Sequence, residues 1–185
     1  MNKGNYRRWG TGSYRLRGYD YASEGVYFIT ICTHDHQHFF GEVAHGSMIL
    51  SPIGSIVENE WQKTPEIRQS INLKLDAYCV MPNHFHALFT IGSPVLPNYD
   101  SCLPATDAVP TQFGGLQSQT VGAIVRGFKG SCTSRIRAGG FSDFRWQKRF
   151  HDRIVRNRRA WYTIRQYILD NPRRWQKDRF YSGHS

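Results

Sequence analysis

The stretch Leu73–Ile91, LKLDAYCVMPNHFHALFTI, decides the fold because it predicts two strands joined by a very short turn. The first strand is predicted over Leu73–Met81 and the second over His84–Ile91, since both segments are short, apolar and aromatic. Pro82–Asn83 between them is a turn pair. Two strands with so short a connection form an antiparallel hairpin.

Further strands and helices are predicted on both sides of this hairpin. Gly25–Thr33, GVYFITICT, is a strand by its β-branched and aromatic residues, and Phe39–Val43 is its expected hairpin partner. Apolar residues at helical spacing predict three helices, over residues 52–63, Val121–Arg137 and Arg158–Asn171. Ser51 and Pro52 suit the start of the first helix. The predicted fold class is α+β, with one central antiparallel sheet and packed helices.

Length and composition predict a single domain over residues 1–185. Apolar residues make up 39% of the chain, and no apolar run approaches the roughly 20 residues of a membrane span. Residues 92–120 hold four prolines and no Lys or Arg, which predicts a flexible insertion loop. The four cysteines are scattered without a CxxC pair, so we expect reduced thiols in a cytoplasmic protein with no membrane partner.

The net charge of +10 is concentrated at the two ends of the chain. Residues 121–185 hold sixteen basic and four acidic residues, and arginine outnumbers lysine 18 to 6 over the whole chain. Guanidinium groups bind phosphates bidentately, and aromatic rings interleaved with them suit unpaired bases. The pattern favours nucleic acid as the partner, and the alternative is an ordinary solvated helix surface.

Two histidines begin the second strand of the hairpin. Side chains alternate across a strand, so His84 and His86 share one face while Phe85 points to the other. Two imidazoles on one face can bind a divalent metal ion, and the alternative is a pair of partly exposed strand histidines. A second cluster, His34–His38 (HDHQH), has polar residues between its histidines, so we expect a solvated turn there.

The last predicted helix carries Tyr167 with Asn171 four residues later, and positions i and i+4 share a helix face. A phenol can act as a covalent nucleophile, and a carboxamide oxygen can serve as a third metal ligand. The alternative for Tyr167 is helix packing with the hydroxyl at the rim. Tyr162, five residues earlier, lies on another helix face and is a weaker candidate nucleophile.

These segments together resemble a known family. VMPNHFHALF (Val80–Phe89) resembles the metal-binding strand of the HUH single-tyrosine transposases. FHDRIVRNRRAWYTIRQYILDNPRRW (Phe150–Trp175) resembles the C-terminal signature of their REP-associated tyrosine transposase branch, and Arg15–Thr33 and Val121–Ile136 are also similar to that branch. The resemblance covers nearly the whole chain except residues 92–120.

The resemblance implies a ferredoxin- or RRM-like HUH fold and a metal-dependent enzyme of DNA transposition. The implied activity is single-stranded DNA cleavage and strand transfer through a 5′-phosphotyrosine intermediate, on palindromic REP-like hairpins. Tyr167 matches the nucleophile, and His84, His86 and Asn171 match the ligands of Mg²⁺ or Mn²⁺. The ligand four residues after the tyrosine is often Gln in related transposases, so Asn171 departs from the pattern. The implied location is the bacterial cytoplasm, at the nucleoid, and relatives include both monomers and homodimers.

Basic and aromatic residues near the two ends of the chain are the candidate DNA contacts. They are Arg7, Arg8, Arg15, Arg17, Arg145, Trp146, Lys148, Arg149, Phe150, Arg153 and Arg156. Two other classes of function remain open from the sequence. One is a non-catalytic, sequence-specific single-stranded nucleic-acid-binding protein, and the other is a metal-dependent nuclease in which water attacks the phosphate.

Overall fold

The computed structural model describes residues 24–94, 96 and 120–181. Its elements, in chain order, are β1 (Gly25–Cys32), η1 (His34–His36), β2 (Gly41–Ala44), β3 (Ser47–Leu50), α1 (Pro52–Gln62), α2 (Thr64–Ile67), η2 (Gln69–Ile71), β4 (Lys74–Met81), β5 (His84–Ile91), α3 (Val121–Ala138), β6 (His151–Val155), α4 (Arg158–Asp170) and η3 (Pro172–Lys177). The three longest helices begin at side-chain caps: Ser51, Thr120 and Asn157 each accept a hydrogen bond from a backbone N–H three residues later.

A four-stranded sheet in the order β4-β5-β1-β6 forms the centre of the fold, and every neighbouring pair of strands is antiparallel. The predicted hairpin is confirmed as β4 and β5, with Met81 paired to His84 across the turn. Cys32, at the end of β1, is paired to His84 on the other side of β5. The predicted α+β class with one central antiparallel sheet is therefore confirmed.

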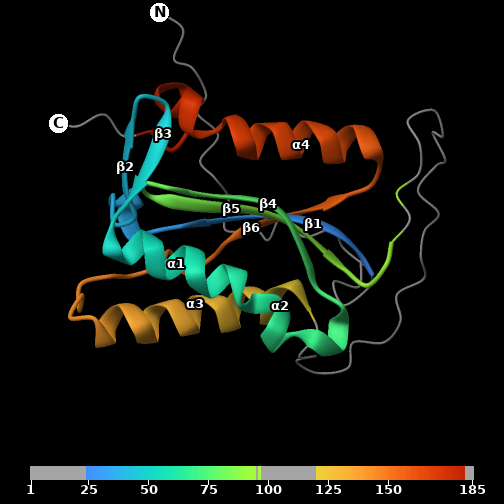
Figure 1. The fold of residues 1–185 in the computed structure, drawn as a ribbon, viewed down its shortest axis with the longest axis horizontal. Helices are drawn as coiled ribbons and strands as arrows, with labels where there is room; N and C mark the ends of the chain where they lie inside the picture. The colour runs from blue at the N-terminus through green and yellow to red at the C-terminus, as the bar shows by residue number, and fades with distance from the viewer. Residues whose placement is uncertain (1–23, 95, 97–119, 182–185) are drawn as a thin grey trace, which may run out of the picture.

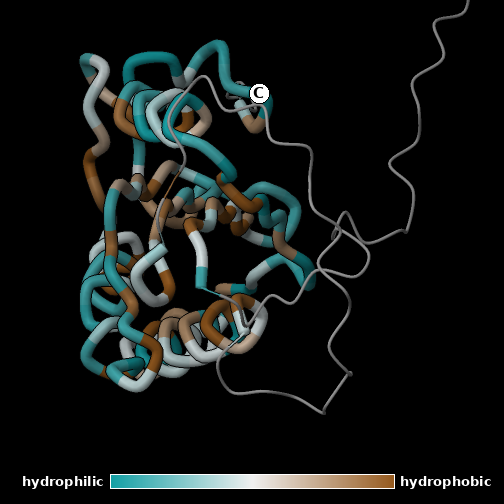
Figure 2. Tube along the Cα trace, turned by 90° about the vertical axis from the view of Figure 1, so that its right-hand side faces the viewer, coloured by the Kyte–Doolittle hydropathy of each residue, from teal (hydrophilic) through white to brown (hydrophobic). Residues whose placement is uncertain are grey.

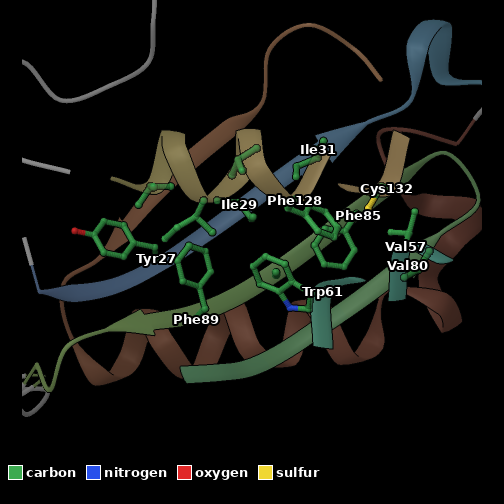
Figure 3. Packing of buried hydrophobic residues seen from close by; sticks show 14 of the residues in the cluster. Tyr27, Ile29, Ile31, Val57, Trp61, Val80, Phe85, Phe89, Phe128 and Cys132 are labelled. Atoms are coloured by element: carbon green, nitrogen blue, oxygen red, sulfur yellow. The ribbon is translucent and has the colours of Figure 1, made fainter. Parts of the chain in front are cut away.

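The main hydrophobic core lies between one face of the sheet and the helices α1 and α3. Alternate residues of β1 and β5, among them Ile29 and Phe85, point into it and are fully buried. Trp61 from α1 and Phe128 from α3 meet them there, with 5.3 Å between the ring centroids of Trp61 and Phe85 (Figure 3). This core fixes the position of β5, and with it the two histidines that alternate with its core residues.

The helix α4 covers the opposite face of the sheet (Figure 1). Ile164 and Ile168 of α4 pack there against Phe28 and Leu88, the residues of β1 and β5 that point away from the main core. The molecule therefore has three layers, and Figure 2 shows the largely hydrophobic strands between the two layers of helices. The His84 and His86 side chains lie on the α4 face, while Phe85 is in the main core, as the strand alternation predicts.

The prediction that Phe39–Val43 pairs with the first strand was wrong. Both edges of β1 are occupied by β5 and β6, and β2 instead pairs with β3 in a separate two-stranded sheet. His45 and Gly46 form the turn between β2 and β3 with φ values of 51° and 73°. The sequence analysis missed β3 because SMIL is short and directly precedes the helix cap.

The other predicted elements agree with the structure to within a residue or two at their ends. The basic sequence Arg145–Val155 is short and predicts a strand or a loop, and in the structure it contributes the edge strand β6. Most of residues 92–120, the expected flexible loop, lie outside the described residues. No helix in the described part of the chain is long and apolar enough to cross a membrane.

Candidate active site

His84 and His86 lie side by side at the start of β5, between the sheet and the C-terminal elements. Both side chains are fully buried, and their ring centroids are 4.5 Å apart. Phe180 covers the pair, with ring centroids 4.6 Å from His84 and 6.3 Å from His86. The strand β5 thus places two imidazoles close together in a buried position, where both could ligate one metal ion.

Hydrogen bonds on the far side of each ring orient the two imidazoles. Asn83 is fully buried and its Nδ2 donates to the carbonyl oxygen of Phe180, so its Oδ1 faces His84 and accepts from Nδ1 at 2.9 Å. On His86, Nδ1 lies 2.9 Å from the Thr30 hydroxyl. Protein metal sites commonly use such outer bonds to fix the tautomer, and here they leave Nε2 of both rings pointing inward.

Both imidazoles are held in the neutral form that metal binding requires. Burial, together with the nearby Arg179 guanidinium, lowers the pKa of His84 to about 3. Burial also lowers the pKa of His86 well below the ordinary value, with His84 contributing next. Neither histidine has to lose a proton before it can ligate an ion near neutral pH.

Tyr167 reaches the histidine pair from α4. Its hydroxyl oxygen lies 3.2 Å from Nε2 of His86 and donates to Oδ2 of Asp178 at 3.3 Å. Burial raises the pKa of Tyr167 to about 12, and the Asp178 carboxylate raises it as well. The side chain remains 38% exposed, so the hydroxyl meets both the buried histidines and solvent. Tyr162, the weaker candidate, is 60% exposed.

Asn171 caps α4 and is only 2% exposed. Its Nδ2 donates to Oδ2 of Asp178 at 3.0 Å, which fixes the orientation of the amide. Its Oδ1 is buried without a hydrogen-bond partner in the described part of the chain, and the same is true of Nε2 of His84. Two buried polar atoms without partners, one on each of two predicted ligands, fit the donor atoms of a metal site.

Asp178, which the sequence analysis missed, completes the group. His84, His86 and Asp178 offer ligand atoms that all lie within 4.8 Å of one another, and this group could hold a metal ion. Asp178 follows η3, and its Oδ1 accepts from the backbone N–H of Phe180 at 2.7 Å. Asp178 shares no motif or helical spacing with Tyr167. The chain turns back after α4, and this turn places Asp178 at the site.

The turn after β1 is also part of this region. His36 stacks on Phe180 with ring centroids 5.5 Å apart, and the ring centroids of His38 and Trp175 are 5.8 Å apart. The expectation of a fully solvated turn was therefore wrong for these two histidines, although His34 and Asp35 are exposed. Aromatic residues from the C-terminal segment cover His36 and His38. The polar sequence of the turn gives no sign of this contact.

The candidate DNA contacts fall into four sets. Arg7, Arg8, Arg15 and Arg17 lie outside the described residues. Arg145, Trp146 and Lys148 line one cleft beside α3. Phe150 packs against the main core, so it is not an open stacking surface. The last set comprises the exposed residues Arg149, Arg153 and Arg156.

The chain has the fold of the REP-associated tyrosine transposases. A solved REP-associated tyrosine transposase bound to a REP hairpin superposes with a TM-score of 0.56 at 16% identity, over 89% of this chain and 74% of that one. The resemblance inferred from the sequence is thus confirmed in the fold. A second structure, a transposase candidate from Deinococcus radiodurans, covers 85% of this chain and 97% of that one at 17% identity, but its TM-score of 0.41 supports no argument.

The chain belongs to the same family as an uncharacterized protein of Haemophilus influenzae. The two are 34% identical over 169 residues, which cover 91% of this chain and 92% of the Haemophilus protein. No protein-family model matches the chain.

Proposed function

We propose that this protein is a single-tyrosine transposase that cleaves and rejoins single-stranded DNA through a 5′-phosphotyrosine intermediate. The observation that carries the proposal is the convergence of Tyr167, from α4, on His86, from β5, with 3.2 Å between the phenol oxygen and Nε2. A tyrosine next to a pair of inward-facing imidazoles suits metal-assisted phosphodiester cleavage, because the imidazoles can hold an ion beside the nucleophile.

The residues present fit a divalent ion, either Mg²⁺ or Mn²⁺. His84, His86 and an oxygen from Asn171 or Asp178 would hold it. The ligand atoms of His84, His86 and Asp178 all lie within 4.8 Å of one another, and Nε2 of His84 and Oδ1 of Asn171 are buried without a hydrogen-bond partner in the described part of the chain. When bound, such an ion would polarise a phosphate oxygen and stabilise the leaving alkoxide. Imidazole is a softer ligand than carboxylate, so we expect Mn²⁺ to support the reaction at least as well as Mg²⁺.

Tyr167 performs the covalent step in this proposal. Its oxygen forms a bond to the scissile phosphorus while the bond from phosphorus to the 3′-oxygen breaks, and the 3′-oxygen takes a proton. Asp178 Oδ2, 3.3 Å away, is placed to accept the phenol proton. Because the pKa of Tyr167 is raised to about 12, the proton must leave as the attack proceeds rather than before it. Resealing by another 3′-hydroxyl reverses these bond changes, so no external energy source is needed.

The structural similarity to a REP-associated tyrosine transposase supports a proposal for the class of DNA. The structural neighbour is bound to a REP hairpin, and the basic C-terminal third of this chain suits a polyanion. We therefore propose palindromic, REP-like hairpins with single-stranded flanks as the substrate. The strong enrichment in arginine supplies bidentate phosphate contacts along such a substrate.

The test is a search for a covalent protein–DNA adduct. Single-stranded oligonucleotides carrying the palindromic repeats nearest the gene are incubated with the protein and Mn²⁺, then separated on a denaturing gel. We expect an SDS-resistant adduct that is lost in Tyr167→Phe and His84→Ala. Tyr162→Phe is the matched control on the same helix, and it should retain the adduct.

Two other results would contradict the proposal. Cleavage without an adduct, unchanged in Tyr167→Phe, would show that water is the nucleophile. Tight binding of the repeats without cleavage in Mn²⁺ or Mg²⁺ would identify a non-catalytic DNA-binding protein.

A further inference from the structure

An open cleft of about 870 Å³ lies between the C-terminal half of α3 and the segment that precedes β6. Four cationic side chains line it: Lys129 and Arg137 from α3, and Arg145 and Lys148 from the facing segment. None of the described residues that line it carries a carboxylate. Cations gathered from two elements without counter-charges give the cleft a strong positive potential, which attracts phosphates.

The walls of the cleft also carry aromatic rings. Trp146 lines it with a half-buried ring, which packs on the fully buried Phe144 with 5.1 Å between the ring centroids. The ammonium group of Lys129 lies 5.9 Å from the Trp146 ring centroid and donates to the carbonyl oxygen of Gln147 at 2.6 Å. The core packing of these rings fixes the floor, whereas Arg137 and Lys148 are exposed at the rim. A fixed apolar floor with a cationic rim is the usual form of a groove for single-stranded nucleic acid.

The short element η1 links the cleft to the candidate active site, which lies on the opposite face of the sheet. His34, at the start of η1, lines the cleft, while His36, at the end of η1, stacks on Phe180 beside His84. Cys32, at the end of β1, is paired to His84 in the sheet, and its carbonyl oxygen accepts from the backbone N–H of Gln147, which lines the cleft, at 2.9 Å. A DNA strand that passes over η1 would therefore reach both the histidine pair and the cleft.

We propose that this cleft binds the phosphate backbone of the unpaired DNA strand that adjoins the hairpin, on the way to the scissile phosphate. This inference rests on the proposed function for the identity of the strand. The half-buried Trp146 ring among these cations favours an unpaired strand, because unpaired bases can stack on an aromatic side chain. The cleft thus separates the two parts of the substrate, since it binds the single-stranded flank and not the paired stem.

Fluorescence anisotropy with two labelled oligonucleotides tests this assignment. One is the hairpin alone, and the other is the same hairpin with a single-stranded extension of about ten nucleotides, within the range that one binding fold usually covers. We expect Lys148→Glu and Arg137→Glu each to weaken binding of the extended oligonucleotide by about tenfold or more. The slope of log affinity against log salt should fall by about 0.7 for each phosphate that the variant no longer neutralises.

The control variant is Lys74→Glu, which makes the same change of charge at an exposed residue at the start of β4. It should bind both oligonucleotides as the wild type does, and the cleft variants should bind the hairpin alone normally. Equal loss for both oligonucleotides, or the same loss in Lys74→Glu, would overturn the assignment. Displacement of the extended oligonucleotide by polyglutamate at matched charge would also overturn it, because the cleft would then bind any polyanion.

The binding assay separates this inference from the proposed chemistry. If the wild type forms no adduct but the cleft variants lose affinity for the extended oligonucleotide, the role of the cleft in binding is supported and the tyrosine mechanism is contradicted. If the wild type forms the adduct and the cleft variants bind the extension normally, the mechanism stands and the cleft assignment fails.

Discussion

The Tyr167 hydroxyl lies 3.2 Å from Nε2 of His86, although 81 positions separate the two residues in the chain. His86 comes from β5 of the sheet, and Tyr167 comes from α4, which packs on one face of that sheet. Their distance therefore depends on how α4 is held against the sheet, not on any local sequence motif. The rings are also in edge contact, with centroids 5.1 Å apart.

Asp76 of β4 is the polar anchor that holds α4 in place. Its Oδ2 accepts from Nε1 of Trp161 at 2.6 Å, and its Oδ1 accepts from Nε of Arg165 at 3.0 Å. We expect Asp76→Ala to lower the free energy of unfolding by about 1–3 kcal/mol, because the half-buried indole N–H loses its acceptor. Urea denaturation measures this change.

Arg165→Ala is the matched control for Asp76. It removes the partly exposed ion pair and the contact of the guanidinium with the Trp161 ring, 5.8 Å from its centroid, but leaves the bond from Trp161 to Asp76, and it should cost about 0–1 kcal/mol. If both variants cost the same, the bond to Trp161 contributes nothing and Asp76 is not the anchor. If Asp76→Ala also slows adduct formation while Arg165→Ala does not, the anchor positions Tyr167 as well as stabilising the helix.

Asn83 should determine metal affinity without touching the metal. Its amide joins Nδ1 of His84 to the carbonyl oxygen of Phe180, so it orients the imidazole and holds the C-terminal segment over it. We expect Asn83→Ala to weaken Mn²⁺ binding by about 10–100-fold, the usual effect of losing an outer-shell partner. Isothermal titration calorimetry measures the affinity.

Asn83→Asp separates the two hydrogen bonds of Asn83. The aspartate still accepts from His84 but no longer donates to Phe180. If it retains most of the Mn²⁺ affinity, the orientation of His84 is the dominant effect. Wild-type affinity in Asn83→Ala would contradict the positioning role altogether, provided that chelator-treated samples show both variants to be folded.

The sheet and the histidine pair could be predicted from the sequence because both follow from local rules. Alternation along His84–Ile91 places both imidazoles on one face, and the spacing of four places Asn171 beside Tyr167 on α4. The pairing of β2 could not be predicted, because it depends on which strands already occupy the edges of β1. The local sequence pattern of a strand does not show which strands will pair with the two edges of β1.

Asp178 shows a second limit of local reasoning. It belongs to no periodic pattern, and its place at the site depends on the turn through η3 that returns the chain over His84. The basic cleft has the same origin. Lys129 and Lys148 belong to different elements, so no helix or strand periodicity relates them. The packing of the segment before β6 against α3 brings them to one surface.

The oxygen ligand of the metal site can be identified by two substitutions. Asp178→Asn removes a charge from the group that could hold the ion, and we expect it to weaken Mn²⁺ binding by at least about tenfold. Asn171→Ala removes a buried amide oxygen that has no partner in the described chain, and we expect a loss of similar size. Calorimetric titration with Mn²⁺ measures both.

The pattern of the two losses decides the ligand set. Loss in both variants means that both oxygens contribute. Loss in Asp178→Asn alone would remove Asn171 from the ligand set and contradict its match to the family pattern. Asp170→Asn, which breaks only an exposed pair with Arg174 on the same turn, is the matched control and should bind Mn²⁺ normally.

The buried histidines predict a loss of stability in acid. The pKa of His84 is about 3 in the folded protein and about 6.5 when the ring is exposed, so between these values the unfolded chain binds a proton that the folded chain does not. The contribution is zero above pH 6.5, and stability falls as the pH decreases from 6.5 towards 3. The slope is at most about 1.4 kcal/mol per pH unit for one such group. His86 acts in the same direction and makes the decline steeper.

Urea denaturation of chelator-treated protein, from about pH 8 to about pH 4, measures this decline. His84→Asn removes one titrating group, so its stability should be lower at neutral pH but should fall less steeply in acid. His45→Asn is the matched control: His45 is exposed in a left-handed turn position with φ of 51°, which Asn tolerates. The slope of this control should equal that of the wild type. If His84→Asn keeps the full wild-type slope, protonation of His84 does not drive the acid transition, and the neutral imidazole that metal binding needs would have to be maintained by something other than burial.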